Sequence, residues 1–383
     1  MTGPRTDADV LIIGAGPAGA AAGIAARRAG ASVLVVDRAR FPRDKTCGDA
    51  VSNHGVELCR ELGALDEILA GPHAIVKRAA AVLPGGERIE RDYAEPGLIA
   101  PRRHLDLALR NALLASGAEL REGVAASGIV ATPRDAHVVT ATGRLYGRVL
   151  IAADGPGSLA WRLVPRPPKA RSLAVARTLY LEGVTLGEAQ TTSEHYFERF
   201  LPFGYGWCFP AVDGVCNVGV YQRADAYRRG GRHLGELLDQ FLQAHPERFA
   251  RARALGRPRT WPLPVASFAP PQAAPGLLCA GDAARLVDPF TGEGIWHALA
   301  SGMLAGTHAA RAAARGGLSA GNAAVYTAAL ARRVSLPAAS RRALQLAMHW
   351  VLRSGLDESR ALQGLLRWGY RGGVLEVAKR VSL

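Results

Sequence analysis

An α/β fold with two domains and a helical C-terminal region is predicted by three observations. First, residues 9–37 have the pattern of a buried strand, a glycine-rich turn, an alanine-rich helix and a second buried strand, which opens a doubly wound sheet. Second, residues 172–222 alternate apolar and polar positions, as in an antiparallel sheet with one covered face. Third, most of the chain beyond residue 320 has a helical pattern. A chain of 383 residues is long enough for about two hydrophobic cores.

The opening unit divides cleanly into elements. Val10–Ile13 is a strand, Ala18–Ala29 is a helix closed by Gly30, and Val33–Val36 is a second strand that ends at Asp37. Further elements are expected along the chain: a helix near 55–62, strands in 75–95 with a Gly85-Gly86 hairpin, helices over 103–116 and 232–254, a break at the WPLP of 261–264, a short buried strand over 276–280, and a helix over 292–310.

The order of these elements predicts that the first domain is discontinuous. It is assigned three segments, 1–75, 101–165 and 273–320. The second domain, built largely of antiparallel sheet, is assigned 76–100 and 166–272, and the proline-rich VPRPPKAR of 164–171 is expected to cross between the two domains. Residues 321–383 form the C-terminal helical region. We expect a small-molecule site at the interface between the domains.

Composition narrows the class of protein. The net charge is +14, but the cations are spread along the chain, only four are lysines, and no recognition motif accompanies them, so nucleic-acid binding is not expected. The five cysteines are scattered without a CxxC pair, which argues against a disulfide framework and against a metal site. No long apolar run predicts a membrane-spanning helix or a signal peptide, and a reducing, cytoplasmic location is expected.

The glycine-rich turn Gly14–Gly19 is a GxGxxG fingerprint in its full strand–turn–helix context. Gly14 permits the tight turn, Gly16 lets the backbone approach a pyrophosphate, and Gly19 lets helix and strand pack closely. The helix N-terminus offers free N–H donors to phosphate. Asp37 is placed to accept hydrogen bonds from an adenosine ribose. The fingerprint predicts a Rossmann-type domain and fits NAD and FAD equally well.

Three later motifs favour FAD. They are Arg102-x-x-Leu105-Asp106, Ala153-Asp154-Gly155-x-x-Ser158, and Ala280–Ala284 followed by Pro289–Ile295. In this order they resemble the large FAD-dependent family typified by aromatic hydroxylases. The resemblance implies that Asp282 binds the ribityl chain and that the glycine-rich turn after it faces the flavin. The cofactor-binding residues so expected are Gly14, Gly16, Pro17, Ala18, Gly19, Asp37, Arg38, Lys45, Cys47, Gly48, Arg102, Asp154, Gly155, Gly281, Asp282, Pro289, Gly292, Glu293, Gly294 and Ile295.

Two further segments narrow the choice of flavoenzyme. Lys45–Asp49 (KTCGD) follows the second strand, and Pro202–Pro210 (PFGYGWCFP) lies in the sheet domain. Together with PFTGEGI they resemble the geranylgeranyl reductase family, whose members have a KxCGG-like loop and a PxxYxWxFP-like strand. That resemblance implies saturation of carbon–carbon double bonds in isoprenoid chains by reduced FAD. Asp49 stands where that family commonly has a second glycine.

Four residues are the catalytic candidates: Cys47, Tyr205, Trp207 and Glu293. Cys47 either delivers a proton to the substrate or lines the pocket. Tyr205 and Trp207 are two apart and face one side of a strand, as a floor of the substrate channel or as sheet core. Glu293 either adjoins the flavin or caps the following helix. Cys208, Cys216 and Cys279 lie in apolar runs and are expected in the core.

The predicted activity is FAD-dependent reduction of a hydrophobic isoprenoid or natural-product substrate. The alternatives are a flavin monooxygenase and a halogenase. A halogenase would use Lys77 to carry activated chlorine, but Lys77 is expected to be an exposed strand residue. The chain has no second GxGxxG, so electrons are expected from NAD(P)H bound transiently or from a separate reductase or ferredoxin. The Leu, Trp and Arg residues after Arg341 form either a structural cap or a basic amphipathic face for peripheral membrane contact.

Overall fold

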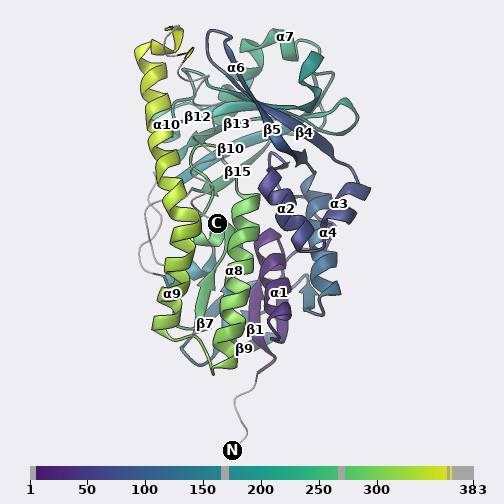
Figure 1. Cartoon of the computed structure of the whole chain (residues 1–383), viewed down its shortest axis with the longest axis vertical. Coiled ribbons are helices and arrows are strands. Elements are labelled where there is room, and N and C mark those ends of the chain that lie inside the picture. The colour runs from purple at the N-terminus through teal and green to yellow at the C-terminus, as the bar shows by residue number, and fades with distance from the viewer. Residues whose placement is uncertain (1–5, 165–171, 266–271, 360–362, 365–383) are drawn as a thin grey trace, which may run out of the picture.

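The computed structural model describes residues 6–164, 172–265, 272–359 and 363–364. It has the predicted α/β architecture, with two sheets and C-terminal helices (Figure 1). The expected crossing at 164–171 lies almost entirely outside the described residues. The domain limits themselves stay a prediction.

The first sheet is parallel at its centre. Its order is β16 (Ala273–Ala274), β17 (Leu277–Cys279), β9 (Gly143–Ala152), β1 (Ala8–Ile13), β2 (Val33–Asp37) and β6 (Glu119–Glu122), and β9 also pairs with β8 (Ala136–Thr140), which pairs with β7 (Ala126–Ala131). Ile12 lies between Ile151 and Val35 in register. Such strands are covered on both faces, which explains their unbroken apolar sequences.

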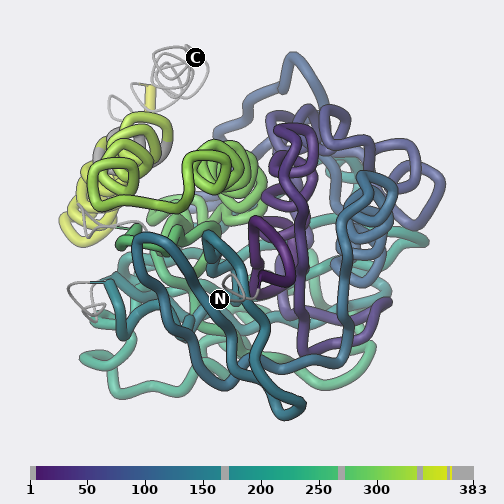
Figure 2. Tube along the Cα trace, turned by 90° about the horizontal axis from the view of Figure 1, so that it is seen from below, coloured from purple at the N-terminus to yellow at the C-terminus, as the bar shows by residue number. Residues whose placement is uncertain are grey.

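Helices cover one face of this sheet as a layer (Figure 2). The layer contains α4 (Arg102–Ala115), α1 (Pro17–Arg28), α8 (Ile295–Ala314) and α9 (Ala320–Leu330). Helices α1 and α8 approach very closely, because a Cβ atom at Gly302 would lie 2.2 Å from the Ala18 oxygen and one at Gly306 would lie 2.1 Å from the Ala22 oxygen. The alanine-rich sequence of α1 is therefore an adaptation to close helix packing.

The second sheet is mostly antiparallel. Its order is β14 (Arg253–Ala254), β10 (Leu173–Glu182), β13 (Cys216–Arg223), β12 (Gly204–Pro210), β11 (Thr192–Tyr196), β4 (Ala74–Val82), β5 (Arg88–Ile99) and β3 (Ala50–Val51), with β15 (Arg259–Pro264) also on β10. Strand β11 pairs in parallel with β4. Strand β3 lies within the first segment assigned to the cofactor domain, yet it pairs with β5 in this second sheet.

The remaining helices lie around these sheets. They are α2 (Asn53–Glu61), α3 (Leu65–Ala70), α5 (Ala224–Gly230), α6 (Leu234–Ala244), α7 (Pro246–Phe249) and α10 (Leu336–Ser354). Figure 1 shows α10 running along one side of the second sheet. In the described part of the chain, no helix is long and apolar enough to cross a bilayer.

Two local expectations were wrong. The WPLP segment does not break structure but forms most of β15, where Pro262 lies opposite Val175. Proline is tolerated there because β15 pairs only with β10 and is an edge strand. The helical pattern of 232–254 ends at Phe249, and Arg253–Ala254 pair with β10 instead.

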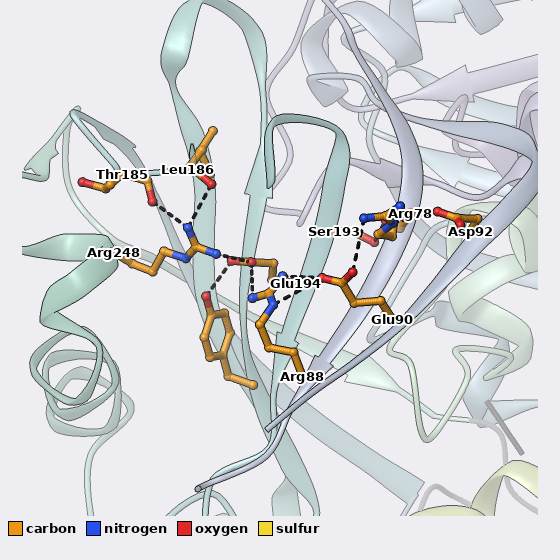
Figure 3. Close-up of polar contacts among 10 residues, drawn as sticks. Arg78, Arg88, Glu90, Asp92, Thr185, Leu186, Ser193, Glu194 and Arg248 are labelled. Carbon is orange, nitrogen blue, oxygen red and sulfur yellow. Dashed lines mark hydrogen bonds and ion pairs between the residues drawn. The ribbon is translucent and has the colours of Figure 1, made fainter. Parts of the chain in front are cut away.

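Alternation along β11 sends successive side chains to opposite faces of the second sheet. Glu194 is fully buried on one face, where it accepts hydrogen bonds from Arg88 Nη1 at 2.7 Å, Arg248 Nη2 at 2.6 Å and the Tyr196 hydroxyl at 2.6 Å (Figure 3). A buried carboxylate needs such partners. The next residue, His195, therefore faces the other side, toward the interior between the two sheets.

Candidate active site

A cavity of about 1130 Å³ lies between the two sheets. It exceeds the ~300–1,000 Å³ typical of a single small-molecule pocket. One part is lined by the glycine turn and strand ends of the first sheet, and the other by aromatic side chains of the second sheet. This is the interface where the sequence predicts a site.

The glycine turn fits a dinucleotide pyrophosphate. Gly14 has a positive φ of 93°, and a Cβ atom there would lie 2.4 Å from the Ala153 oxygen. Gly16 caps α1 without any side-chain hydrogen bond, and Pro17 is the first helical residue. The first-turn N–H groups of α1 thus have no side-chain cap and face the cavity, which is the arrangement that binds phosphate.

Asp37 holds the same turn from the end of β2. Its Oδ2 accepts from Ala15 N at 2.7 Å and its Oδ1 accepts from Ala39 N at 2.8 Å. The carboxylate is buried at the cavity wall, and the neighbouring Arg38 also lines the cavity. These contacts orient the carboxylate while each oxygen retains a further lone pair for a ribose.

Asp154 and Gly155 line the cavity at the end of β9. The Asp154 Oδ2 accepts from Leu159 N at 2.8 Å. Burial raises the pKa of Asp154 above its usual range. Ser158, from the same motif, caps the short 3-10 helix that follows by accepting from Ala160 N.

Arg102 begins α4 and forms a buried bidentate pair with Asp106, with both N···O distances at 2.7 Å. Arg43 adds a second cation, 2.9 Å from Asp106 Oδ2. The Cys47 side chain also interacts electrostatically with Arg102. Two arginines on one buried carboxylate leave a local excess of positive charge beside the cavity, which suits an anionic cofactor.

Lys45 reaches across the cavity toward the second half of the cofactor site. Its Nζ lies 3.8 Å from Asp282 Oδ2 and 5.2 Å from the centre of the Trp261 ring. Burial, and secondarily the charge of Arg102, lower the pKa of Lys45. Lys45 therefore brings the KTCGD loop next to the GD motif, although Lys45 and Asp282 are 237 positions apart in the sequence.

The turn Asp288–Gly294 is held rigidly from three sides. Asp288 Oδ1 accepts from the backbone N–H groups of Phe290 and Thr291, both at 2.8 Å. Asp288 Oδ2 accepts from Arg341 Nη1 at 2.7 Å. The Tyr205 hydroxyl donates to the Thr291 oxygen. The backbone atoms of the Asp288–Gly294 turn are therefore held in place at the cavity wall.

Gly292, Glu293, Gly294 and Ile295 all line the cavity. A Cβ atom at Gly292 would lie 2.8 Å from the Tyr205 hydroxyl oxygen, so this close approach requires glycine. Helix α8 begins at Ile295 with Gly294 as its N-cap and no side-chain cap. The alternative that Glu293 caps this helix is therefore wrong, and the free helix terminus faces the cavity.

Three predicted cofactor residues do not line the cavity. Gly19 is needed for packing, because a Cβ atom there would lie 1.7 Å from the Gly14 oxygen. Gly281 donates its N–H to Ser301 Oγ at 2.9 Å, and a Cβ atom there would lie 2.8 Å from that of Ala18. Pro289 presents its carbonyl oxygen to Tyr221 and Gln345. These residues shape the site from behind, whereas all the other predicted residues line it.

The far part of the cavity is an aromatic chamber. Tyr205 and Trp207 both line it, as the two-residue spacing predicts. Phe209, Phe197 and Tyr221 complete this wall, with Tyr205 and Tyr221 stacked at 5.2 Å between ring centres. Val76, Ala79, Ala81, Leu83, Ile89, Leu263, Leu344 and Met348 add an aliphatic lining. Such a surface accepts a long apolar molecule.

His195 also lines this chamber, and no motif in the sequence predicts it there. Its ring lies 5.3 Å from Tyr205 and 5.1 Å from Phe209, in edge-on contacts. Burial lowers the pKa of His195 to about 4, so it is neutral at physiological pH. The one sequence feature that points to His195 is its place between Glu194 and Tyr196 in a five-residue strand, where neighbouring side chains face opposite sides. Among the described residues, no cluster of candidate ligands could hold a metal ion.

The fold and the site together define an FAD-dependent oxidoreductase. Residues 7–313 match the family model described as an FAD binding domain. The chain belongs to the geranylgeranyl reductase family of FAD-dependent flavoproteins.

Two relatives align with most of this chain. The chain is 32% identical over 318 residues to a menaquinone reductase of Mycolicibacterium smegmatis, an alignment that covers 79% of this chain and 76% of the relative. It is 31% identical over 324 residues to digeranylgeranylglycerophospholipid reductase 2 of Methanopyrus kandleri, covering 79% and 77%.

Solved structures agree on the fold. A geranylgeranyl bacteriochlorophyll reductase-like protein of Thermoplasma acidophilum superposes with a TM-score of 0.80 at 22% identity, covering 98% of this chain and 99% of the other. A flavin-dependent brominase superposes with a TM-score of 0.78 at 19% identity, covering 95% and 93%. At these identities the likeness concerns the fold alone. Lys77, which a halogenase would use to carry chlorine, is exposed on β4 and is not among the residues lining the cavity.

Proposed function

We propose that this enzyme saturates carbon–carbon double bonds in the isoprenoid chain of a lipid or quinone, or in a similarly long apolar natural product. The observation that carries the proposal is the aromatic and aliphatic chamber that opens directly onto the Asp288–Gly294 turn and the Cys47 loop. Reduced FAD, when bound, supplies the hydride equivalent. Its reductant is NAD(P)H or a protein donor.

The residues of the chamber divide into three proposed roles. Tyr205 and Trp207 hold the substrate chain by their ring faces, since the Tyr205 hydroxyl already donates to Thr291 and the Trp207 indole to Asn217. Cys47, half-buried at the cavity wall, supplies the proton to the second alkene carbon. Glu293, within the Asp288–Gly294 turn, sets the local charge.

Two molecules are the natural first substrates to try, because the relatives' names point to them: a menaquinone and an archaeal digeranylgeranyl lipid. Anaerobic, photoreduced enzyme is mixed with each, and flavin absorbance and product mass are followed. We expect flavin reoxidation and a mass gain of two hydrogens per double bond. Deuterated NADPH then tests the donor, and C47A is expected to slow reoxidation in enzyme that has first been saturated with FAD.

The opposite result is also well defined. If reduced flavin persists with every polyprenyl substrate but reacts in air to give an oxygenated or halogenated product, reduction is not the activity. Oxygenation and halogenation are thus outcomes of the same experiment.

A further inference from the structure

Asp49 is fully buried immediately after the Cys47 loop, at 0% exposure. Its backbone has a positive φ of 61°, a conformation natural to glycine and tolerated by aspartate and asparagine. Unlike Cys47 and Gly48, it is not among the residues lining the cavity. Its side chain therefore acts from behind the loop, on the side of the second sheet.

A single amide joins Asp49 to the chamber. Asp49 Oδ2 accepts from the Tyr180 hydroxyl and from Asn217 Nδ2 at 2.9 Å. The same Asn217 Nδ2 donates to the Cys47 oxygen at 2.8 Å. Asn217 Oδ1 accepts from Trp207 Nε1 at 3.0 Å and from Thr178 Oγ1 at 2.8 Å.

These contacts fix the loop relative to the aromatic wall. Asn217, on β13, holds Cys47 with its amide nitrogen and Trp207 with its amide oxygen. The loop also lies directly on that wall, because a Cβ atom at Gly48 would lie 3.3 Å from the Phe209 ring and 3.6 Å from Trp207 Nε1. Displacement of the loop would change the distance between the Cys47 thiol and anything held against Trp207.

The burial of Asp49 is unfavourable for stability taken alone. Burial raises the pKa of Asp49 to about 6, against the opposing hydrogen bonds from Tyr180 and Asn217. The titratable groups facing it are Tyr180 from β10 and Arg102 from α4; Cys47, two residues before it in the same loop, acts on Tyr180. Glycine would satisfy the backbone conformation without this cost, so the carboxyl group adds something other than turn geometry.

We propose that Asp49 is a positioning residue that, through Asn217 and Tyr180, holds the Cys47 loop at a set distance from the aromatic wall. The proposal rests on the proposed function in one respect only: the distance between the loop and the wall matters for catalysis if Cys47 gives a proton to a bound alkene. The placement of the loop can be measured without any substrate.

The test uses three variants of the FAD-bound enzyme. D49G removes the anchor and keeps the left-handed backbone. D49N keeps an oxygen acceptor at the same place. D213G is the matched control, since Asp213 is exposed and has a similar φ of 55°. The readout is the rate at which a small alkylating reagent modifies Cys47, identified by peptide mass; the other four cysteines are buried.

We expect D49G to raise the Cys47 modification rate about tenfold, with D49N and D213G within about twofold of the native rate. With a working substrate, D49G should also lower kcat by ~10–100-fold, the cost of misplacing a catalytic group by about 1 Å, with little change in KM. Y180F, which removes only one hydroxyl, should also raise the Cys47 modification rate and lower kcat. It replaces D49G in the test if D49G fails to fold.

An unchanged Cys47 modification rate in D49G and Y180F overturns the positioning role. A raised rate in an enzyme that reduces no alkene leaves the anchor standing and rejects the proposed function instead. The two claims therefore fail separately.

Discussion

The Tyr205 hydroxyl donates a hydrogen bond to the backbone oxygen of Thr291, joining strand β12 of the second sheet to the Asp288–Gly294 turn. Burial raises the pKa of Tyr205 well above its ordinary value, so the hydroxyl stays protonated. The side chain thus has two functions: its ring lines the chamber and its oxygen fixes the turn. A tyrosine so engaged is poorly suited to give its proton to a substrate.

Replacing Tyr205 by phenylalanine tests this division of roles. Y205F keeps the ring and loses one buried hydrogen bond, worth about 0.5–1.5 kcal/mol. We expect FAD binding to weaken about 3–10-fold while the substrate-dependent reoxidation rate changes less. FAD titration by fluorescence gives the first quantity and anaerobic stopped-flow the second. Y227F, on the distant helix α5, is the control. Loss of reoxidation by orders of magnitude would instead make Tyr205 the acid.

The part of the cavity wall around the glycine turn could be predicted because its sequence signals are local. The Gly14–Gly19 turn, the strands around it and Asp37 lie within one short segment. Gly14 and Gly19 are required there because a Cβ atom at either position would collide with a neighbouring backbone oxygen. Tyr205 and Trp207 were predictable from the two-residue period of a strand. These inferences need no knowledge of distant contacts.

The rest depends on long-range pairing. His195 faces the chamber because β11 pairs with β4 and β12, and nothing in the sequence around it predicts that parallel partner. The WPLP segment becomes a strand because β10 offers it an edge. Arg341 meets Asp288 across 53 positions. Such contacts are set by tertiary packing, which outweighs local preference.

The ion pair between Arg341 and Asp288 links α10 to the Asp288–Gly294 turn at the cavity wall. Arg341 is 8% exposed and Asp288 is 1% exposed, and removal of one partner from a buried pair costs about 3–5 kcal/mol. We expect R341A to lower the free energy of unfolding by that order and to weaken FAD binding. Urea denaturation of the FAD-bound enzyme measures the first effect. R353A, on the exposed face of the same helix, should change neither; equal effects in both variants would exclude a specific link.

Asp49 should leave a signature in the pH dependence of stability. Its folded-state pKa of about 6 lies above the ordinary value of 3.8, so between these values the folded protein holds a proton that the unfolded chain has released. Stability from this group is therefore present at pH 4 and is lost as the pH rises through 6. The loss is on the order of 3 kcal/mol.

The variant D49N removes this titration. Its free energy of unfolding, minus that of the native enzyme, should increase between pH 4 and pH 7, whereas D213N, at an exposed aspartate, should give a flat difference. Urea denaturation across that range supplies both curves. A flat D49N difference would mean that Asp49 is not the buried acid that the structure shows.

Helix α10 also has an outer face of unusual character. Leu346 is 49% exposed and Trp350 is 62% exposed, one turn apart, with Arg353 exposed beside them. The opposite face of the same helix contributes Leu344 and Met348 to the chamber. An apolar stripe with tryptophan and a flanking arginine is typical of a helix that lies in a membrane interface. We therefore expect the enzyme to sediment with vesicles containing anionic lipid.

The variant W350S tests that expectation directly. It should lower the vesicle-bound fraction several-fold while leaving FAD binding unchanged, because Trp350 points away from the chamber. L255S, which alters an exposed leucine near β14, should bind vesicles like the native enzyme. If W350S binds vesicles as well as the native protein does, α10 serves as a cover for the chamber and not as a docking face. Equal binding to neutral and anionic vesicles would show that Arg353 contributes nothing by its charge.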